Sequence, residues 1–207
     1  MPGADPRAMS HSWLFTGPPG SGRSLAAIDF AAALMCTDPE EPGCGRCEAC
    51  RAVLETKQHT DLVLVDPQEV IIPVDTVREV IGRAASLPTV APWRVVIFNN
   101  ADRLNNNGAN ALLKTVEEPP ARTVIIMCAP SDAPEDFSQT LRSRCRHLYI
   151  PSPSVESITA QLVSEGASDH DAHLAALTSL RHVGRARRLV NDPAVQKRRA
   201  VAINLAE

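Results

Sequence analysis

Aromatic side chains are scarce in this sequence: two Trp, one Tyr and four Phe make up 3% of its 207 residues. A core formed with so few of them must be aliphatic, built from Ala, Val, Leu and Ile. The chain also lacks an apolar run of about 18 residues, so no membrane span is indicated. Its start lacks the basic-then-apolar pattern of a secretory signal. These absences favour a cytoplasmic protein.

An excess of charge of either sign is lacking as well. The 21 Lys and Arg residues against 24 Asp and Glu residues give a net charge of −3, so the whole chain shows no electrostatic signature of nucleic-acid binding. A basic stretch from Arg181 to Arg199 could touch DNA phosphates, but a solvated helical face is the simpler interpretation. With 44% hydrophobic and 22% charged residues, the composition is that of an ordinary globular protein.

Short, continuous apolar segments recur along the first 150 residues. They have the length and composition of buried strands, and they lie at 13–17, 61–66, 93–98 and 123–129. Ala-rich or helically periodic stretches separate them. Strands buried on both faces and separated by helices predict a parallel α/β sheet flanked by helices.

The character of the chain changes at the segment PSPS, which begins at Pro151. Everything after this segment has the pattern of helices. We therefore expect an α/β domain over residues 1–150 and a small all-helical lid domain over residues 151–207.

The segment GPPGSGRS at 17–24 has almost the spacing of a phosphate-binding loop and lies between a strand and a helix. Its glycines let backbone amides converge on phosphate oxygens at a helix N-terminus, and its last residue is placed to ligate magnesium. The candidate nucleotide-binding residues are Gly17, Gly20, Ser21, Gly22, Arg23 and Ser24. Arg23 stands where such loops carry lysine, and its planar guanidinium is a poor substitute for a compact ammonium. A tight turn that binds nothing is the alternative.

The strand at 93–98 is followed by Asn99 and Asn100. In ATPases of this architecture, acidic residues at this place hold magnesium and activate water. An amide carries no charge for the metal and no basicity for the water, so strand-end capping is the simpler interpretation of both residues. Together with Arg23, they predict that the chain does not hydrolyse ATP and binds ATP or ADP weakly at most.

Four of the six cysteines lie within the segment 36–50, as Cys36-x7-Cys44-x2-Cys47-x2-Cys50. Four thiolates at this spacing predict a tetrahedral zinc site, and because they close the coordination sphere the zinc is structural. Buried free cysteines are the alternative. The other two cysteines, Cys128 inside an apolar strand and Cys145 near a strand start, are expected in the core.

The ordered set of motifs carries a family resemblance. GPPGSGRS, the four-cysteine insert, ANALLKTVEEPP and LRSRC follow one another as in bacterial clamp loaders of the AAA+ class. The chain resembles most closely the delta-prime family of DNA polymerase III, over about residues 12 to 190. The resemblance implies an AAA+ P-loop fold with a zinc module. The ATP-hydrolysing tau/gamma subunits share this layout but keep the loop lysine and the acidic pair.

The resemblance also implies roles for single residues. Ser143-Arg144-Cys145 matches the family motif whose arginine reaches into the ATP site of a neighbouring subunit, where a guanidinium stabilises the charge on the transferred phosphoryl group. Arg144 would thus act in trans. A surface ion pair is the alternative for Arg144. Ser131 falls near the first nucleotide-sensing position, and Arg187 matches the second but is expected to be structural.

The implied function is that of a non-hydrolysing clamp-loader subunit within the DNA polymerase III holoenzyme, itself without ATPase or polymerase activity. The implied partners are the tau/gamma ATPase subunits, the delta subunit, the sliding clamp and, through the complex, primed DNA; no membrane is involved. Members of the family carry a further N-terminal segment and a helical collar domain, so we expect a truncated chain. Two alternatives stay open: a tau/gamma-like ATPase that tolerates Arg23, and a zinc-dependent DNA-binding module.

Overall fold

A computed structural model of the protein describes residues 10–67 and 69–192. At its centre lies a five-stranded sheet in the order β2-β3-β4-β1-β5, and every neighbouring pair is parallel. The strands are β1 Ser12–Thr16, β2 Leu62–Val65, β3 Arg94–Phe98, β4 Thr123–Ala129 and β5 Arg146–Tyr149. The predicted parallel α/β sheet is confirmed.

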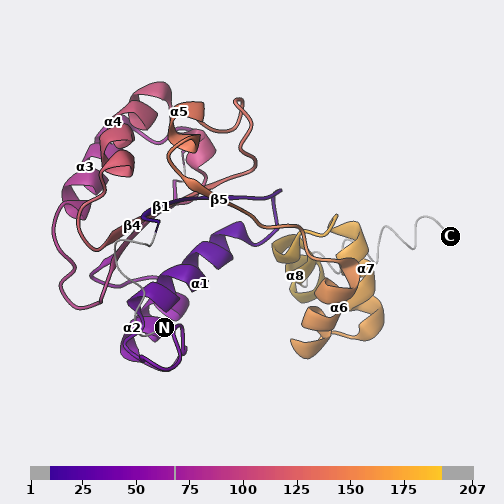
Figure 1. Ribbon diagram of the computed structural model, residues 1–207. Helices are drawn as coiled ribbons and strands as arrows, with labels where there is room; N and C mark the ends of the chain where they lie inside the picture. Colours follow the sequence, from indigo (N-terminus) through magenta and orange to yellow (C-terminus); the bar gives the residue numbers. More distant parts are fainter. Residues whose placement is uncertain (1–9, 68, 193–207) are drawn as a thin grey trace. The chain divides into compact units, whose positions relative to one another are not determined.

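Helices cover both faces of this sheet (Figure 1). The helices and helical turns that accompany the sheet are α1 Arg23–Met35, α2 Glu48–Arg51, η1 Ala52–Thr56, α3 Val74–Ala84, η2 Ala101–Arg103, α4 Asn106–Glu117 and α5 Gln139–Arg142. Side chains from α3 and α4 pack on one face and those from α1 on the other. Successive residues of β1, Leu14 and Phe15, therefore enter different core layers.

Local sequence sets the limits of these helices. Asn105 caps α4, because its side chain accepts a hydrogen bond from the backbone N–H of Gly108 at 2.8 Å. The two prolines after Glu118 prevent the helix from continuing. In the same way, Ser154 and Ser168 cap two helices in the C-terminal part of the chain.

The described residues form two compact units. The sheet unit comprises Arg23–Tyr149 and the described residues before Gly17; the helical unit comprises Gly17–Gly22 and the described residues from Ile150 onward. The helical unit contains α6 Val155–Ser164, α7 Asp169–Thr178 and α8 Val183–Asn191. Its core consists largely of alanines, which let the helices approach closely, together with Ile158 and Leu162. The predicted helical C-terminal part is confirmed. Among the described helices, none is both long and apolar enough to cross a membrane.

Three of the few aromatic residues gather in the sheet unit, on the α1 face of the sheet. The ring of Trp13 lies 5.2 Å from that of Phe30 and 6.2 Å from that of Phe15, both edge-on. The guanidinium carbon of Arg146 lies 5.0 Å from the centre of the Trp13 ring, a cation–π contact. Three of the seven aromatic side chains thus pack together on this face, whereas Phe98 and Phe137 belong to the core on the other face.

A buried ion pair fixes the loop between α3 and β3. Asp61 and Arg94 lie 3.0 Å apart, and the Asp61 side chain is fully buried. The Asp61 carboxylate also accepts hydrogen bonds from the backbone N–H groups of Thr89, Val90 and Ala91 at 2.7 to 2.9 Å. Burial acts to raise the pKa of Asp61, but the three backbone donors and Arg94 outweigh it and hold the pKa well below its usual range.

We expect the substitution Asp61→Asn to destabilise the sheet unit by about 3–5 kcal/mol, because it leaves the buried Arg94 charge without a counter-charge. Since the pKa of Asp61 is lowered in the folded state, its contribution is complete above the unfolded pKa of about 4 and is lost as the pH falls below it. Urea unfolding at pH 7 and at pH 3 measures both effects. The acid-induced loss of stability should be smaller in the variant.

Asp75→Asn is the matched control. Asp75 pairs with Arg78 at 2.9 Å, but both side chains are exposed, so its loss should change the free energy of unfolding by less than about 1 kcal/mol. Equal effects of the two substitutions would show that the Asp61 pair does not hold the fold.

Candidate functional site

The four cysteines predicted as metal ligands lie together. Their sulfur atoms are all within 4.8 Å of one another, with Cys36 Sγ 3.7 Å from Cys44 Sγ and 3.9 Å from Cys47 Sγ. A tetrahedral zinc ion with Zn–S bonds of about 2.3 Å separates its sulfur ligands by about 3.8 Å. The cluster, which Cys50 completes, could therefore hold a zinc ion.

The local fold of the segment explains this convergence. Cys36 directly follows the last residue of α1, and Cys47 caps the short helix α2, with its sulfur accepting the backbone N–H of Cys50 at 3.4 Å. Between them, Gly43 and Gly45 have φ values of +81° and +68°, which L side chains rarely adopt. The chain can thus reverse within a few residues and return its sulfurs to one point.

Backbone donors prepare the sulfurs for metal binding. The N–H of Asp38 points at Cys36 Sγ at 3.4 Å. The backbone N–H of Thr37 is the main cause that lowers the pKa of Cys47 to about 6. For Cys36, burial acts to raise the pKa, but backbone donors outweigh it and the pKa is lowered. Burial raises the pKa of Cys50 to about 12. At neutral pH part of the cluster is therefore already in the thiolate form that binds metal.

The glycines of the candidate phosphate loop lie close to other backbone atoms of the helical unit. A Cβ atom on Gly17 would stand 2.2 Å from the carbonyl oxygen of Ile150. Gly20 has a φ of +87°, and a Cβ atom there would stand 2.4 Å from Cγ of His182. Both positions therefore require glycine, for reasons of packing within this unit as well as for any approach of a phosphate.

Two further features of the loop are compatible with an anion. A Cβ atom on Gly22 would meet nothing within 4 Å, so the backbone there is open. The Ser21 hydroxyl is buried and has no hydrogen-bond partner among the described residues. Arg23 and Ser24, the remaining candidates, begin α1 in the sheet unit. These features fit a phosphate group without showing one.

Two amides, Asn99 and Asn100, directly follow β3. The backbone N–H of Asn99 continues the ladder by donating to Val65 O at 2.8 Å, while its side-chain Oδ1 is buried without a hydrogen-bond partner in the described part of the chain. Asn100 adopts a left-handed conformation with φ +53° before η2 and makes no side-chain capping bond. The capping interpretation of the two residues is therefore wrong. A neutral amide oxygen remains where a hydrolase needs a carboxylate.

The two cysteines outside the cluster belong to the core, as predicted. Cys128 is fully buried and Cys145 is 8% exposed. Burial raises the pKa of each thiol to about 12. The positive charge of Arg23 acts against this rise at Cys128, which places the arginine of the phosphate loop near β4.

Arg144 is held at the surface of the sheet unit by three partners. Its Nε donates to Glu117 at 3.3 Å, and its Nη1 donates to the Thr140 carbonyl at 2.9 Å and to the Ser143 hydroxyl at 3.3 Å. The side chain is 34% exposed. Within the described residues Nη2 has no partner, so it can donate two hydrogen bonds to another molecule. The surface ion pair that was the alternative for Arg144 thus exists, and it occupies only one edge of the guanidinium.

A cavity of 240 Å³ adjoins this arginine. Its lining comes from the start of β1, the end of α4 and the start of β5, and consists of Ser10, His11, Ser12, Val116, Glu117, Pro119, Arg144 and Arg146. Two guanidinium groups and one carboxylate line it, so the cavity is suited to an anionic or a hydrogen-bonding group.

The two residues at the nucleotide-sensing positions are both engaged in local contacts. Ser131 donates to Asp136 Oδ2 at 2.7 Å, and its hydroxyl also accepts the N–H of Ala133. Arg187 pairs with Glu165 through Nε and Nη2, with the shortest contact at 2.5 Å. The structural role expected for Arg187 agrees with this pair. The basic stretch that begins at Arg181 continues outside the described residues.

Sequence reasoning missed a polar network at the end of β1. Thr16 Oγ1 lies 2.6 Å from His147 Nε2 on β5. The other ring nitrogen of His147 lies 3.6 Å from Asp132 and 3.3 Å from Arg142, and these two residues pair at 3.0 Å. The Arg142 hydrogen bond is the main cause that lowers the pKa of Asp132. Thr16 immediately precedes the phosphate loop, so the network fixes the residue from which the loop starts.

The chain is similar to subunits of DNA polymerase III. The sequence profile of the family "DNA polymerase III, delta subunit" matches residues 4–154. DNA polymerase III subunit delta′ of Pseudomonas aeruginosa is 35% identical over 76% of this chain and 49% of the relative, and that of Escherichia coli is 34% identical over 81% and 50%. Subunit gamma/tau of Mycobacterium tuberculosis is 33% identical over 81% of this chain and 30% of the relative. The chain spans about half the length of the curated delta′ relatives it matches.

Solved structures share the fold. A gamma subunit-related protein of DNA polymerase III from Thermotoga maritima superposes with a TM-score of 0.54 at 19% identity, over 88% of this chain and 55% of that one. The RuvB Holliday junction branch migration motor of the same organism gives 0.54 at 17% identity, over 88% and 54%. At this identity the likeness shows an AAA+-like fold alone.

Proposed function

The chain belongs to the DNA polymerase III delta subunit family, and we propose on that basis that it is a clamp-loader subunit that hydrolyses no ATP itself. In this proposal it supplies Arg144 to the ATP site of a neighbouring ATPase subunit during loading of the sliding clamp onto primed DNA. Its partners would be tau/gamma-type ATPase subunits and a delta subunit, assembled in the cytoplasm.

This proposal rests mainly on one observation, the way in which the Arg144 guanidinium is held at the surface of the sheet unit. Glu117 holds Nε and the Thr140 carbonyl holds Nη1, while Nη2 has no partner among the described residues. A guanidinium held in this way has lost much of its rotational freedom before it meets a phosphate. It can then donate to the oxygens of a transferred phosphoryl group and offset the charge that develops there.

The chain lacks side chains that ATP hydrolysis needs. Arg23 replaces the lysine of the phosphate loop, and the buried amide of Asn99 replaces a carboxylate. The loop glycines supply backbone N–H groups that do not depend on these side chains, so weak occupation by ATP or ADP is compatible with the absence of turnover. The chain would thus stimulate a neighbour without consuming nucleotide.

The cysteine cluster has a structural role in this proposal. Cys36, Cys44, Cys47 and Cys50 would hold one zinc ion, which with four thiolate ligands supplies cross-linking and no open position for a substrate. The cluster follows α1 directly, and Cys50 Sγ also contacts the Ala32 carbonyl within that helix at 3.6 Å. The site would therefore fasten the zinc module to the C-terminal end of α1.

The isolated chain should release no phosphate from ATP above the buffer background. A matched variant, Arg23→Lys, should also stay inactive, because Asn99 and Asn100 still provide neither a magnesium ligand nor a base. Steady-state phosphate release measures both. The chain should raise the rate of clamp loading when it is added to the ATPase subunit, the delta subunit, the clamp and primed DNA.

Hydrolysis by the isolated chain that disappears in an Arg23→Ala variant would favour the tau/gamma-like ATPase instead. DNA binding by the isolated chain that requires zinc would favour the DNA-binding module.

A further inference from the structure

The strand β2 is an edge of the sheet, and none of the described strands pairs with its outer side. On its inner side, Asp61 and Val65 accept backbone hydrogen bonds from Val95 and Asn99. Because backbone groups alternate in direction along a strand, the N–H and C=O of Leu64 point to the outer side. An exposed edge of this kind can pair with another chain unless it is covered.

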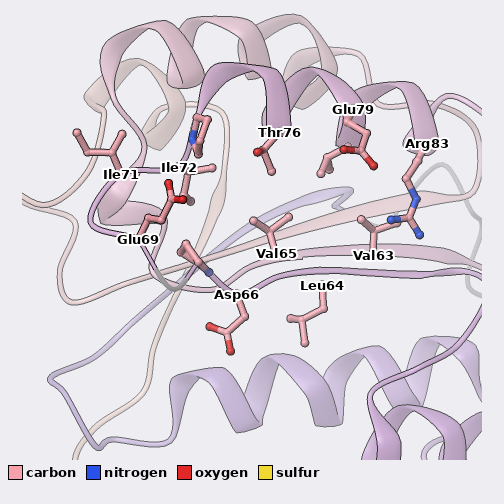
Figure 2. A pocket seen from close by; sticks show the side chains of 13 residues that line it. Val63, Leu64, Val65, Asp66, Glu69, Ile71, Ile72, Thr76, Glu79 and Arg83 are labelled. Carbon is pink, nitrogen blue, oxygen red and sulfur yellow. The ribbon is translucent and has the colours of Figure 1, made fainter.

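A groove runs along this open edge, between β2 and α3 (Figure 2). A cavity of 380 Å³ lies beside the end of the strand, and a second cavity of 290 Å³ lies beside its beginning. Val63 and Arg83 line both, so the two cavities form one groove, which we call the β2 groove. It lies within the sheet unit and includes none of the candidate site residues.

Side chains of α3 form one wall of the β2 groove. Thr76, Glu79 and Arg83 follow one another at helical spacing and point toward the strand, as Figure 2 shows. Exposed aliphatic side chains stand at both ends: Ile71 is 51% exposed and Leu87 is 63% exposed. A strand edge beside a helix wall is the arrangement with which some domains bind extended peptides by adding a strand.

The charges of the groove are ordered. Glu69 lies beyond the end of β2, Arg83 lies beside Val63 toward the beginning of the strand, and Glu79 follows Arg83 on the α3 wall (Figure 2). The Asp66 side chain points away from α3, to the same side of the strand as Leu64 (Figure 2). In the part of the chain that the structure describes, none of these four side chains forms an ion pair. Each charge is therefore available to a ligand.

We propose that the β2 groove binds an extended segment of a partner protein, which pairs with β2 as an added antiparallel strand. The segment would carry a basic side chain opposite the acidic end and an acidic side chain opposite Arg83, with a small apolar residue between them over Val63 and Val65. The Leu64 backbone would supply the central hydrogen bonds. The charge order favours this ligand, and cavities of this size suit the side chains of one strand rather than the surface of a folded domain.

A labelled peptide with the sequence TKTVTET tests the proposal with the full chain. It places Lys, Val and Glu on one face of a strand, in the order that the groove requires. Fluorescence anisotropy should show saturable binding, and the reversed peptide TETVTKT should bind about tenfold more weakly. Arg83→Glu should weaken binding of TKTVTET about tenfold and improve binding of TKTVTKT, because it reverses the charge at one end only.

A second pair of variants tests the strand edge itself. Leu64→Pro removes an N–H that points away from β3 and should abolish binding of TKTVTET, whereas Leu64→Ala keeps this N–H and should retain binding. Circular dichroism and the midpoint of urea unfolding establish that both variants are folded. Equal binding of the forward and reversed peptides, or binding unaffected by Leu64→Pro in the folded variant, would overturn the proposal. So would a dimer of the parent chain that Leu64→Pro dissociates, since the edge would then pair with a second copy.

Discussion

Arg144→Ala should reduce ATP turnover at the one ATP site that this chain faces, by up to about 10³–10⁵-fold if the arginine acts there alone. The substitution removes the only group that the proposal sends to the neighbour. Fold and zinc content should persist, because Arg144 is a surface side chain whose partners, Glu117 and Thr140, remain. An assembly with several ATP sites would conceal the loss at this one site if only the total rate of ATP hydrolysis were measured. Single-turnover hydrolysis at the affected site, together with the rate of clamp loading, is therefore the measurement.

Two further variants test whether the neighbouring site needs the guanidinium group rather than any positive charge, and whether it needs the contact of Arg144 with Glu117. Arg144→Lys should fail almost as severely, because an ammonium does not reproduce the planar, two-pronged contact with a phosphate. Glu117→Gln keeps an acceptor for Nε but removes the counter-charge, so by itself it should cause an intermediate loss, and it should cause no further loss when it is combined with Arg144→Ala. Parental loading rates in both arginine variants would show that Arg144 is only a surface residue.

Removal of zinc should unfold the segment between α1 and β2. On the four-thiolate interpretation the protein purified without chelator contains about one zinc per chain, and the apparent binding free energy of such sites at pH 7 is about 10–16 kcal/mol. Since no preformed cluster exists in the unfolded chain, this energy is largely folding energy. Elemental analysis and proteolysis after chelation measure the two effects. Cys44→Ser should lose the metal, whereas Cys145→Ala, which removes a core thiol, should keep it.

The same site should respond to pH in a defined direction. Zinc binds thiolates, so protons compete with it and the metal is lost as the pH falls. The metal-free cluster has one thiol with its pKa lowered to about 6, that of Cys47, and another with its pKa raised by burial to about 12, that of Cys50. Zinc affinity should therefore rise with pH throughout the neutral range, because binding displaces the proton from Cys50. An affinity independent of pH between 6 and 8 would contradict a four-thiolate site.

The features that sequence predicted best are local ones. The strands at 93–98 and 123–129 are buried on both faces, and a continuous apolar run is sufficient to identify them. The cysteine cluster was predictable because its four members lie within one short segment, where spacing alone determines that they can meet.

Contacts between distant segments were not predictable. Asp61 and Arg94 are 33 residues apart, Glu117 and Arg144 are 27 apart, and Thr16 and His147 are 131 apart. No periodicity links such residues, because the topology of the sheet brings them together. The capping interpretation of Asn99 failed because the fold buries its Oδ1 without a hydrogen-bond partner among the described residues, which the local sequence does not reveal.

The uneven placement of the aromatic residues has a practical consequence for spectroscopy. Both tryptophans, Trp13 and Trp93, and the single tyrosine, Tyr149, belong to the sheet unit, and the sequence from Ile150 onward contains no Phe, Trp or Tyr. Intrinsic fluorescence and near-ultraviolet circular dichroism therefore report on the sheet unit. The helices α6 to α8 contribute to the far-ultraviolet circular dichroism but to neither of these two aromatic signals. Unfolding curves recorded by the two kinds of signal can thus distinguish a chain that melts as one cooperative body from one whose parts melt separately, with no label attached.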